Sequence, residues 1–268
     1  MATAETRTID VDGQRIGVAI KRGDGVPLLI FNDLGANLKL LDPLTRALEG
    51  IETIVFDVPG IGGSKVRRLP YRLRGLTRLA VGTLDKLGYA AEVDVLGVSW
   101  GGSLAQQFAR SYPLRCLRLV LAATTPGILM VPGSPRVLAK LLAPRRYKDP
   151  AYLNKIAPQL YGGQIRMTPD LVWDYTAQLK TPIGSAISTS RWPLGAGRVC
   201  YGCRYYVSRP WYSPAVTIPL PRLSNSRILA WLIPKARLHV VEDGHLFLMV
   251  GSLAAAPVLR TFLLSPGA

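Results

Sequence analysis

The residues best suited to chemistry form the run Gly97-Val98-Ser99-Trp100-Gly101-Gly102, directly after a short apolar stretch. The pattern G-x-S-x-G is typical of a strand that ends in a sharp turn into a helix, with the serine hydroxyl exposed at the turn. Glycines two positions before and after the serine let strand and helix approach closely. The helix points backbone N–H groups at the place where negative charge would develop. This spacing favours a serine nucleophile over an ordinary glycine-rich turn.

The base that such a serine needs is found almost by elimination, because the sequence contains two histidines. His239 lies inside the apolar run 238–241, where a packed structural role is expected. His245 follows that run in the loop Glu242-Asp243-Gly244-His245, the place where an α/β-hydrolase carries its general base. Ser99 and His245 also stand in the chain order that this architecture requires. We therefore predict that His245 is the base.

The triad acid has no identifiable candidate. It should lie between the serine and the histidine, on the loop after a late strand, where it holds the imidazole and stabilises its cation. No Asp or Glu occurs from Tyr175 to Val241, and the alternative position after the strand ending near Ala123 offers only Thr124 and Thr125. Other carboxylates fall in the presumed cap or too close to the histidine along the chain: Asp170, Asp174, Glu242 and Asp243.

Alternating strands and helices must position these residues. Short apolar runs without a helical period predict strands at 28–31, 53–56, 93–96 and 117–122, and helical patterns fall between them at 37–49, 71–88 and 101–112. Such a βαβ series predicts an α/β fold, a mostly parallel sheet with helices on both faces. Regular order returns with a helix at 226–233, a strand at 237–241 and a helix at 252–264.

These elements divide the chain into a core, a cap and an aberrant segment. We expect the core at 1–123 and 224–268, and a helical cap inserted at the Pro-rich stretch 124–182. Residues 183–223 contain no convincing buried strand, since the nearest approach, Val216–Ile218, is hemmed in by four prolines. We therefore expect the late strand before the acid loop to be missing or disordered.

Composition bounds the class of protein. The N-terminus has no basic region followed by an apolar one, and the longest apolar stretch, around 246–259, is interrupted by Gly, Ser and Pro. We expect no signal peptide and no transmembrane segment, hence a cytoplasmic protein. Three cysteines without a secretory signal do not indicate a disulfide framework.

The formal net charge of +16 at pH 7 is unusual for a cytosolic hydrolase. A dense basic run would suit an anionic surface or nucleic acid: Lys65, Arg67, Arg68, Arg72, Arg74 and Arg78. The apolar residues of 71–88 recur at helical spacing and leave most of these charges on the opposite side, so a solvated helix face is the favoured interpretation. No nucleic-acid motif accompanies the charge, and we expect no nucleic-acid partner.

Specific runs extend over residues 1–180 and 225–265: Phe56-Asp57-Val58-Pro59-Gly60, Gly62-Gly63-Ser64, Ala105-Gln106-Gln107-Phe108-Ala109, Leu119-Val120-Leu121-Ala122-Ala123-Thr124, Met130-Val131-Pro132-Gly133, Pro144-Arg145-Arg146-Tyr147, Ile156-Ala157-Pro158, Tyr161-Gly162-Gly163, Arg227-Ile228-Leu229-Ala230-Trp231 and Asp243-Gly244-His245-Leu246-Phe247-Leu248. With the serine motif, these runs resemble the intracellular medium-chain-length poly(3-hydroxyalkanoate) depolymerases, which have the α/β-hydrolase fold.

The resemblance implies a serine esterase that acts on a polyester storage granule in the cytoplasm, without cofactor or metal. Ser99 would attack an ester carbonyl and His245 would take its proton. The backbone N–H of Trp100 is the first oxyanion donor expected from the geometry, and the resemblance implies Leu34 as the second. Asp33 stands where relatives have a small Gly, and an inward-facing carboxylate there would oppose a developing oxyanion. The cap around 126–163 would supply an apolar pocket for alkyl side chains.

Between residues 183 and 223 the resemblance stops. Relatives have there a strand followed by Asp-Asp-Pro, which carries the triad acid. Read one base out of frame with permitted codons, Ser208–Pro221 gives Pro-Thr-Leu-Val-Leu-Ala-Gly-Gly-Asp-Asp-Pro-Ile-Thr-Pro. Our hypothesis is that about residues 183–223 are translated out of frame. The C-x-x-C pair Cys200 and Cys203 then needs no redox or zinc function.

Two alternatives to a working depolymerase stay open. The first is an inactive relative that still binds granules, because the acid is absent. The second is an esterase for small esters, because fold alone does not fix the substrate. Side-chain length preference and oligomeric state do not follow from these residues.

Overall fold

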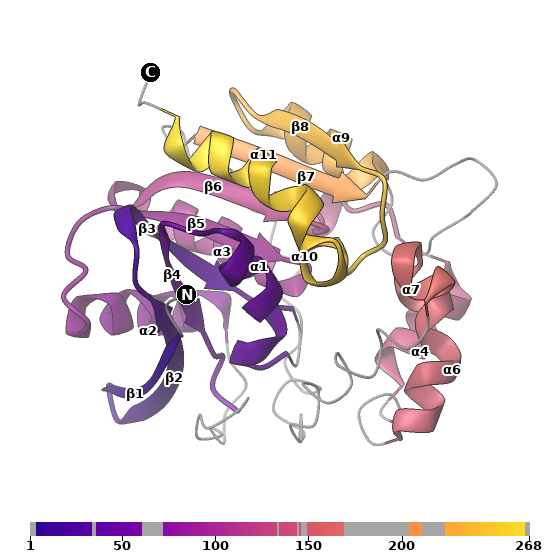
Figure 1. Ribbon diagram of the computed structural model, residues 1–268, viewed down its shortest axis with the longest axis horizontal. Helices are drawn as coiled ribbons and strands as arrows, with labels where there is room; N and C mark the ends of the chain where they lie inside the picture. The colour runs from indigo at the N-terminus through magenta and orange to yellow at the C-terminus, as the bar shows by residue number, and fades with distance from the viewer. Residues whose placement is uncertain are drawn as a thin grey trace.

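The structure, a computed structural model, describes residues 4–33, 36–60, 72–132, 134–143, 145, 149–168, 204–210 and 223–265. Within these residues an eight-stranded sheet runs in the order β1-β2-β4-β3-β5-β6-β7-β8 (Figure 1). The strands are β1 (Glu5–Val11), β2 (Gln14–Lys21), β3 (Asp24–Phe31), β4 (Ile51–Phe56), β5 (Val93–Val98), β6 (Cys116–Ala122), β7 (Arg204–Pro210) and β8 (Arg237–Val241).

Strands β3 to β8 pair in parallel, as predicted, whereas β1 and β2 form an antiparallel hairpin on the β4 edge. The hairpin turns at Asp12 and Gly13, whose φ angles are 53° and 73°. Positive φ at both turn residues is typical of the tight turn that Asp-Gly favours between two strands. The hairpin therefore adds two strands that the predicted βαβ series does not contain.

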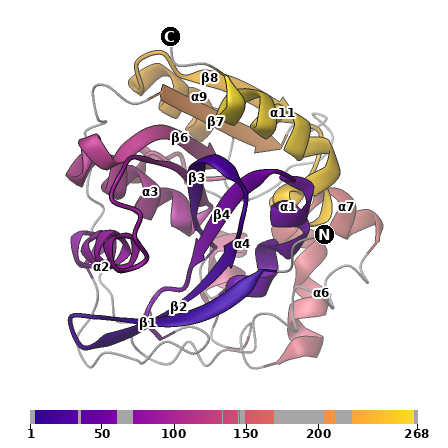
Figure 2. The ribbon, with the colours of Figure 1, turned by 60° about the vertical axis from the view of Figure 1, so that its left-hand side comes forward.

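Helices cover both faces of the sheet (Figures 1 and 2). One face packs against α1 (Asp42–Ala47), α10 (Phe247–Val250) and α11 (Ser252–Leu264). The other packs against α2 (Leu73–Lys86), α3 (Trp100–Ser111) and α9 (Leu223–Leu232). Short 3-10 turns lie at Leu38–Leu41 (η1), Pro113–Arg115 (η2) and Gly127–Leu129 (η3).

The amphipathic pattern of α2 accounts for part of the basic run. Leu76, Ala80 and Leu84 are buried against the sheet, because apolar residues three or four apart share one side of a helix. Arg74 and Arg78 are exposed on the other side, and Arg78 forms an ion pair with the exposed Asp12 at 2.7 Å. In α2 the charges thus form a solvated helix face. Residues 61–71 lie outside the described residues.

The expectation of a missing late strand is wrong. Strand β7 fills that position, pairing in parallel with β6 from Arg118↔Arg204 to Ala122↔Ser208 and with β8 from Tyr206↔Arg237 to Pro210↔Val241. Its centre, Tyr205-Tyr206-Val207, consists of aromatic and β-branched residues with high strand propensity. Two neighbouring strands offer it backbone partners on both sides, which outweighs the lack of a long apolar run. Val216–Ile218 lies outside the described residues.

The expected cap region contains three helices that lie together at one end of the molecule (Figure 1): α4 (Pro135–Leu142), α6 (Pro150–Tyr161) and α7 (Gly163–Met167). Asp149 caps α6 by accepting the N–H of Tyr152 at 3.0 Å. Helix α6 buries Leu153, Ile156 and Leu160 in the same apolar cluster as α10 and α11. Residues 169–182 of this region and the pair Cys200 and Cys203 lie outside the described residues.

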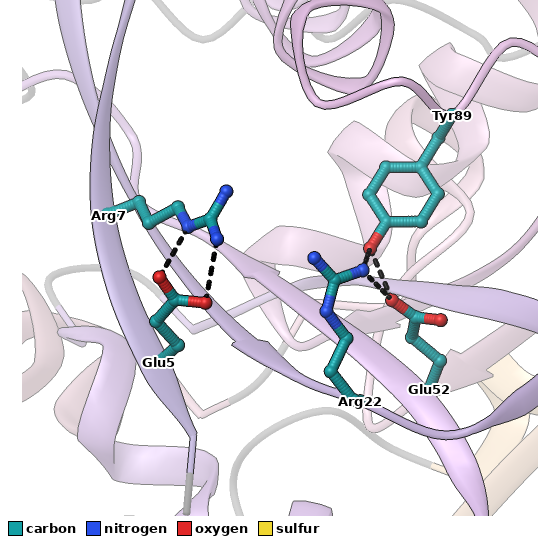
Figure 3. Close-up of polar contacts among 5 residues, drawn as sticks. All are labelled: Glu5, Arg7, Arg22, Glu52 and Tyr89. Atoms are coloured by element: carbon teal, nitrogen blue, oxygen red, sulfur yellow. Dashed lines mark hydrogen bonds and ion pairs between the residues drawn. The ribbon is translucent and has the colours of Figure 1, made fainter.

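A polar cluster of Arg22, which directly follows β2, Glu52 of β4 and Tyr89 lies at the amino ends of the parallel strands (Figure 3). Arg22 donates to Glu52 and to the Tyr89 hydroxyl, each at 3.0 Å. Tyr89 in turn donates to Glu52. Burial, followed by this hydrogen bond to Glu52, raises the pKa of Tyr89 to about 12. Because Ser99 follows the carboxyl end of β5, the cluster belongs to the opposite edge of the sheet.

Candidate active site

The turn from β5 into α3 holds Ser99 in an unusual backbone conformation. Its φ is 53° and its ψ is −116°, a left-handed value that costs an L-residue energy and is often found at functional turns. A Cβ on Gly97 would lie 2.5 Å from the carbonyl oxygen of Gly101, and a Cβ on Gly101 would lie 2.1 Å from that of Phe31. The close approach of strand and helix inferred from the glycine spacing is therefore present.

Backbone hydrogen bonds fix this turn. The Ser99 N–H donates to the carbonyl of Ala122 at the end of β6 at 2.9 Å, and the Ser99 carbonyl accepts the N–H of Gly102 at 3.0 Å. The half-buried Trp100 begins α3 directly after the serine. Its backbone N–H belongs to the first turn of the helix, whose N–H groups have no partner within the helix. The predicted oxyanion donor therefore lies directly beside Ser99, at the start of α3. Leu34, the expected second donor, lies outside the described residues.

His245 lies in the loop between β8 and α10, and its Nε2 is 3.0 Å from Ser99 Oγ. The structure therefore brings together the two residues, 146 positions apart in sequence, that the motif and the elimination of His239 had singled out. His239 lies within β8, where its backbone is in register with Ser208 of β7.

Tyr161, the last residue of α6, contacts His245 in two ways. Its carbonyl accepts the His245 N–H at 2.7 Å, and its ring stacks on the imidazole with centroids 6.2 Å apart and planes inclined by 16°. The sequence prediction missed this role. The run Tyr161-Gly162-Gly163, where α6 ends and α7 begins, was the signal that marked the position.

Asp33 faces inward. Its carboxylate Oδ2 lies 4.0 Å from His245 Nε2, and both side chains are 7% exposed. The Asp33 N–H donates to Asn32 Oδ1 at 2.8 Å, so this N–H is engaged within the loop. The Asp33 side chain therefore places a carboxylate beside the nitrogen that contacts the serine.

The triad acid is expected directly after β7 in the sequence. In the α/β-hydrolase architecture the acid follows this strand. Here the strand is followed by residues 211–222, which contain neither Asp nor Glu. These residues lie outside the described residues, as do Asp170 and Asp174. Glu242 is exposed. The Asp243 carboxylate accepts hydrogen bonds from Gln164 of α7. Neither of these two is hydrogen-bonded to the His245 ring.

Asp57 adds a further buried carboxyl directly after β4, at the same end of the parallel strands as Ser99. Burial raises its pKa to about 8, and its Oδ1 finds no hydrogen-bond partner among the described residues. The group is therefore protonated and neutral through most of the neutral range.

Within the described ranges, no three His, Cys, Asp or Glu side chains gather where they could hold a metal ion. None of the helices in the described part of the chain combines the length and hydropathy that a membrane span needs.

Comparison with known proteins gives relatives along almost the whole chain. The family model of the alpha/beta hydrolase fold matches residues 26–167. The poly(3-hydroxyalkanoate) depolymerase of Ectopseudomonas oleovorans is 43% identical over 274 residues, which cover 96% of this chain and 92% of that protein. An esterase from Thermogutta terrifontis is similar in structure, with a TM-score of 0.77 at 21% identity over 98% of each chain. A hydrolase from Pseudomonas aeruginosa has a TM-score of 0.73 at 22% identity, over 97% of this chain and 98% of that one.

Proposed function

The chain belongs to the α/β-hydrolase family and, within it, to the poly(3-hydroxyalkanoate) depolymerases, and we propose that it hydrolyses intracellular medium-chain-length polyhydroxyalkanoate through a serine acyl-enzyme. The predicted family and fold class are confirmed, and the protein is a carboxylic ester hydrolase. The observation that carries the proposed mechanism is the 3.0 Å contact between Ser99 Oγ and His245 Nε2. The named activity of the 43% identical relative supports the substrate class.

In the proposed reaction His245 Nε2 accepts the Ser99 proton while Oγ attacks the ester carbonyl carbon. The oxyanion forms against the backbone N–H of Trp100 and that of Leu34. Collapse of this intermediate breaks the ester bond, and His245 protonates the departing 3-hydroxyl oxygen of the polymer. Water, deprotonated by His245, then attacks the acyl-enzyme and releases the 3-hydroxy acid.

We propose that residues 124–182 form the cap that receives the alkyl side chains and that 1–123 and 224–268 form the catalytic core. The buried apolar side of α6 supports this division, because it joins the cap to the cluster beneath the His245 loop. The proposed place of action is the surface of polyhydroxyalkanoate granules in the cytoplasm.

Release of 3-hydroxyoctanoate from an emulsified medium-chain polymer tests this function. The wild type should release the monomer, and Ser99→Ala should not. Ser103→Ala, one turn further along α3, should retain full activity and is the matched control. Hydrolysis of p-nitrophenyl acetate without release of monomer would instead assign a small-ester esterase. Neither activity, with the protein still cosedimenting with polymer granules, would assign an inactive granule-binding relative.

That inactive alternative is favoured by one observation. The sequence from 175 to 241 contains no carboxylate that could serve as the triad acid, and loss of the acid alone costs about 10⁴-fold in kcat in a related constellation. The polymer assay must therefore detect rates about four orders of magnitude below those of an intact enzyme of this kind.

A further inference from the structure

The loop that carries His245 is bound to the cap at the junction of α6 and α7. Besides the hydrogen bond from the His245 N–H to the Tyr161 carbonyl, the residue before Gly244 reaches across to this junction. Asp243 is 6% exposed, and its Oδ1 accepts the backbone N–H of Gln164 at 2.9 Å. Its Oδ2 accepts the side-chain amide of Gln164 at 3.0 Å.

The same carboxylate also fixes the loop itself. Oδ1 of Asp243 accepts the N–H of Gly244 at 2.6 Å, so one oxygen joins the first turn of α7 to the residue next to His245. Hydrogen bonds to an ionised acceptor are stronger than those between neutral groups. A buried carboxylate that loses them would be left with an uncompensated charge. Loss of the hydrogen bonds from Gln164 or from Gly244 to this carboxylate would therefore cost free energy.

The two backbones meet without space between them. Gly163 has a φ of 54°, and a Cβ there would lie 1.9 Å from the Gly244 nitrogen and 2.3 Å from Asp243 Oδ1. Such a distance leaves no room for a side chain. The junction is therefore held both by close packing and by hydrogen bonds.

We propose that Asp243 is a positioning residue that ties His245 to the α6–α7 junction, so that the cap and the catalytic base move as one unit. This inference rests on the proposed function, since it assigns His245 as the base. Tyr161 contacts the backbone and the ring of His245. Asp243 fixes the preceding residue of the loop, Gly244, through its hydrogen bond. Displacement of the junction would shift Nε2 relative to Ser99 Oγ. The effect would fall on kcat rather than on KM, because the contact lies on the base and not on the substrate.

Two substitutions of Asp243 separate positioning from charge. Asp243→Ala removes all three hydrogen bonds and should lower kcat for p-nitrophenyl octanoate about 100-fold, with KM changed less than about twofold. Asp243→Asn keeps an acceptor oxygen for the two backbone N–H groups, and the Gln164 amide can turn to accept from the new NH₂. It should retain activity within about fivefold of the wild type. Glu242→Ala, an exposed carboxylate one residue earlier, is the matched control and should have no effect.

A third variant perturbs the contact without removing the carboxylate. A Cβ on Gly251 would lie 2.5 Å from Asp243 Oδ2, so Gly251→Ala should displace the carboxylate and lower kcat to a value between those of the Asn and Ala variants. Circular dichroism and the melting temperature identify the folded fraction on which each rate is based. If Asp243→Ala does not fold, the kcat values of Asp243→Asn and Gly251→Ala are still compared with that of the wild type.

Amide hydrogen exchange supplies a readout that does not depend on activity. In Asp243→Ala or Gly251→Ala the His245 N–H should exchange at least about tenfold faster, while β5 remains protected. Unchanged exchange and unchanged kcat in folded Asp243→Ala or Gly251→Ala would overturn the proposal. Equal losses of kcat in Asp243→Asn and Asp243→Ala, or a loss in Glu242→Ala, would overturn it as well. If hydrolysis does not depend on Ser99, the proposed function fails, and the exchange result alone decides whether Asp243 ties the loop to the cap.

Discussion

The carboxylate of Asp33 lies 4.0 Å from Nε2 of His245, the same nitrogen that contacts Ser99 Oγ at 3.0 Å. This distance is too long for a hydrogen bond but short enough for a strong charge interaction between two buried groups. In a conventional triad the carboxylate sits on the other nitrogen and leaves Nε2 bare to accept the serine proton. Here the negative charge favours a proton on Nε2, which opposes its action as a base.

Asp33→Asn should therefore raise activity. Removal of the negative charge removes the preference for a proton on Nε2, so kcat/KM at about pH 7.5 should rise about tenfold. The measurement is kcat/KM on p-nitrophenyl octanoate. Asp24→Asn, at the exposed start of the same strand β3, should leave kcat/KM unchanged. A loss of activity in Asp33→Asn would instead make Asp33 a substitute for the absent acid.

Restoring the other reading frame over residues 183–223 should restore the acid. In that frame the two Asp codons fall at the positions of Val216 and Thr217, on the loop after β7. The expected gain in kcat is about 10⁴-fold, the effect of a triad acid on its own. It is measured by comparing the reframed protein with the present chain on the same ester. As a control, the reframed protein with both new Asp codons changed to Asn codons should lose the gain.

The nucleotide sequence gives a second test of the same hypothesis. Codons 180–225 should read through in the alternative frame without a stop and should contain the Asp-Asp-Pro codons. A stop codon in the alternative frame would exclude a frame shift as the origin of this segment. An alternative frame without the Asp-Asp-Pro codons would exclude it as well.

Asp57 should make stability depend on pH. Its pKa is raised by burial from an ordinary 3.8 to about 8 in the folded chain, so the folded state holds more protons than the unfolded state between these values. Stability from this group is present below the lower pKa, falls as pH rises and is lost above about pH 8. Asp57→Asn removes this slope, and its unfolding free energy relative to the wild type should increase from about pH 5 to about pH 9. Urea denaturation followed by circular dichroism measures it; parallel curves for both proteins would contradict the prediction.

The ion pair between Asp94 of β5 and Arg118 of β6 should be needed for stability. Both side chains are buried, their contact is 2.8 Å, and Arg118 also donates to the Ser265 carbonyl after α11. Burial raises the pKa of Asp94 to about 6, although Arg118 opposes the shift. Arg118→Met leaves that carboxylate unpaired and should cost about 3 kcal/mol of unfolding free energy above pH 7. Adding Asp94→Asn should recover part of the loss. A single-variant loss below about 1 kcal/mol would contradict this assignment.

The parallel core could be predicted because its strands are continuous apolar runs and its turns carry glycine. Strand β8 and helix α11 have the predicted bounds, 237–241 and 252–264. The hairpin β1–β2 was missed, although Asp12-Gly13 between two half-polar strands is a recognisable turn signal. Strand β7 was missed because its pairing is imposed by β6 and β8 and not by its own hydrophobicity.

Within the candidate site, the proximity of Ser99 and His245 could be predicted because backbone geometry and chain order constrain them. The inward orientation of Asp33 and the contact of Asp243 with Gln164 could not, since both depend on how loops 79 or more positions apart meet in space. A sequence pattern gives the spacing of residues along the chain, whereas these contacts join segments that are far apart in the sequence.

Labelling with a serine-reactive fluorophosphonate tests the central claim most directly. Intact-mass analysis of the folded wild type should show a single adduct, and peptide mapping should locate it on Ser99. Ser99→Ala should give no adduct, Ser103→Ala should label like the wild type, and His245→Gln should label much more slowly because the base is lost. Absence of an adduct on Ser99 in folded wild-type protein would contradict the account of this chain as a serine hydrolase.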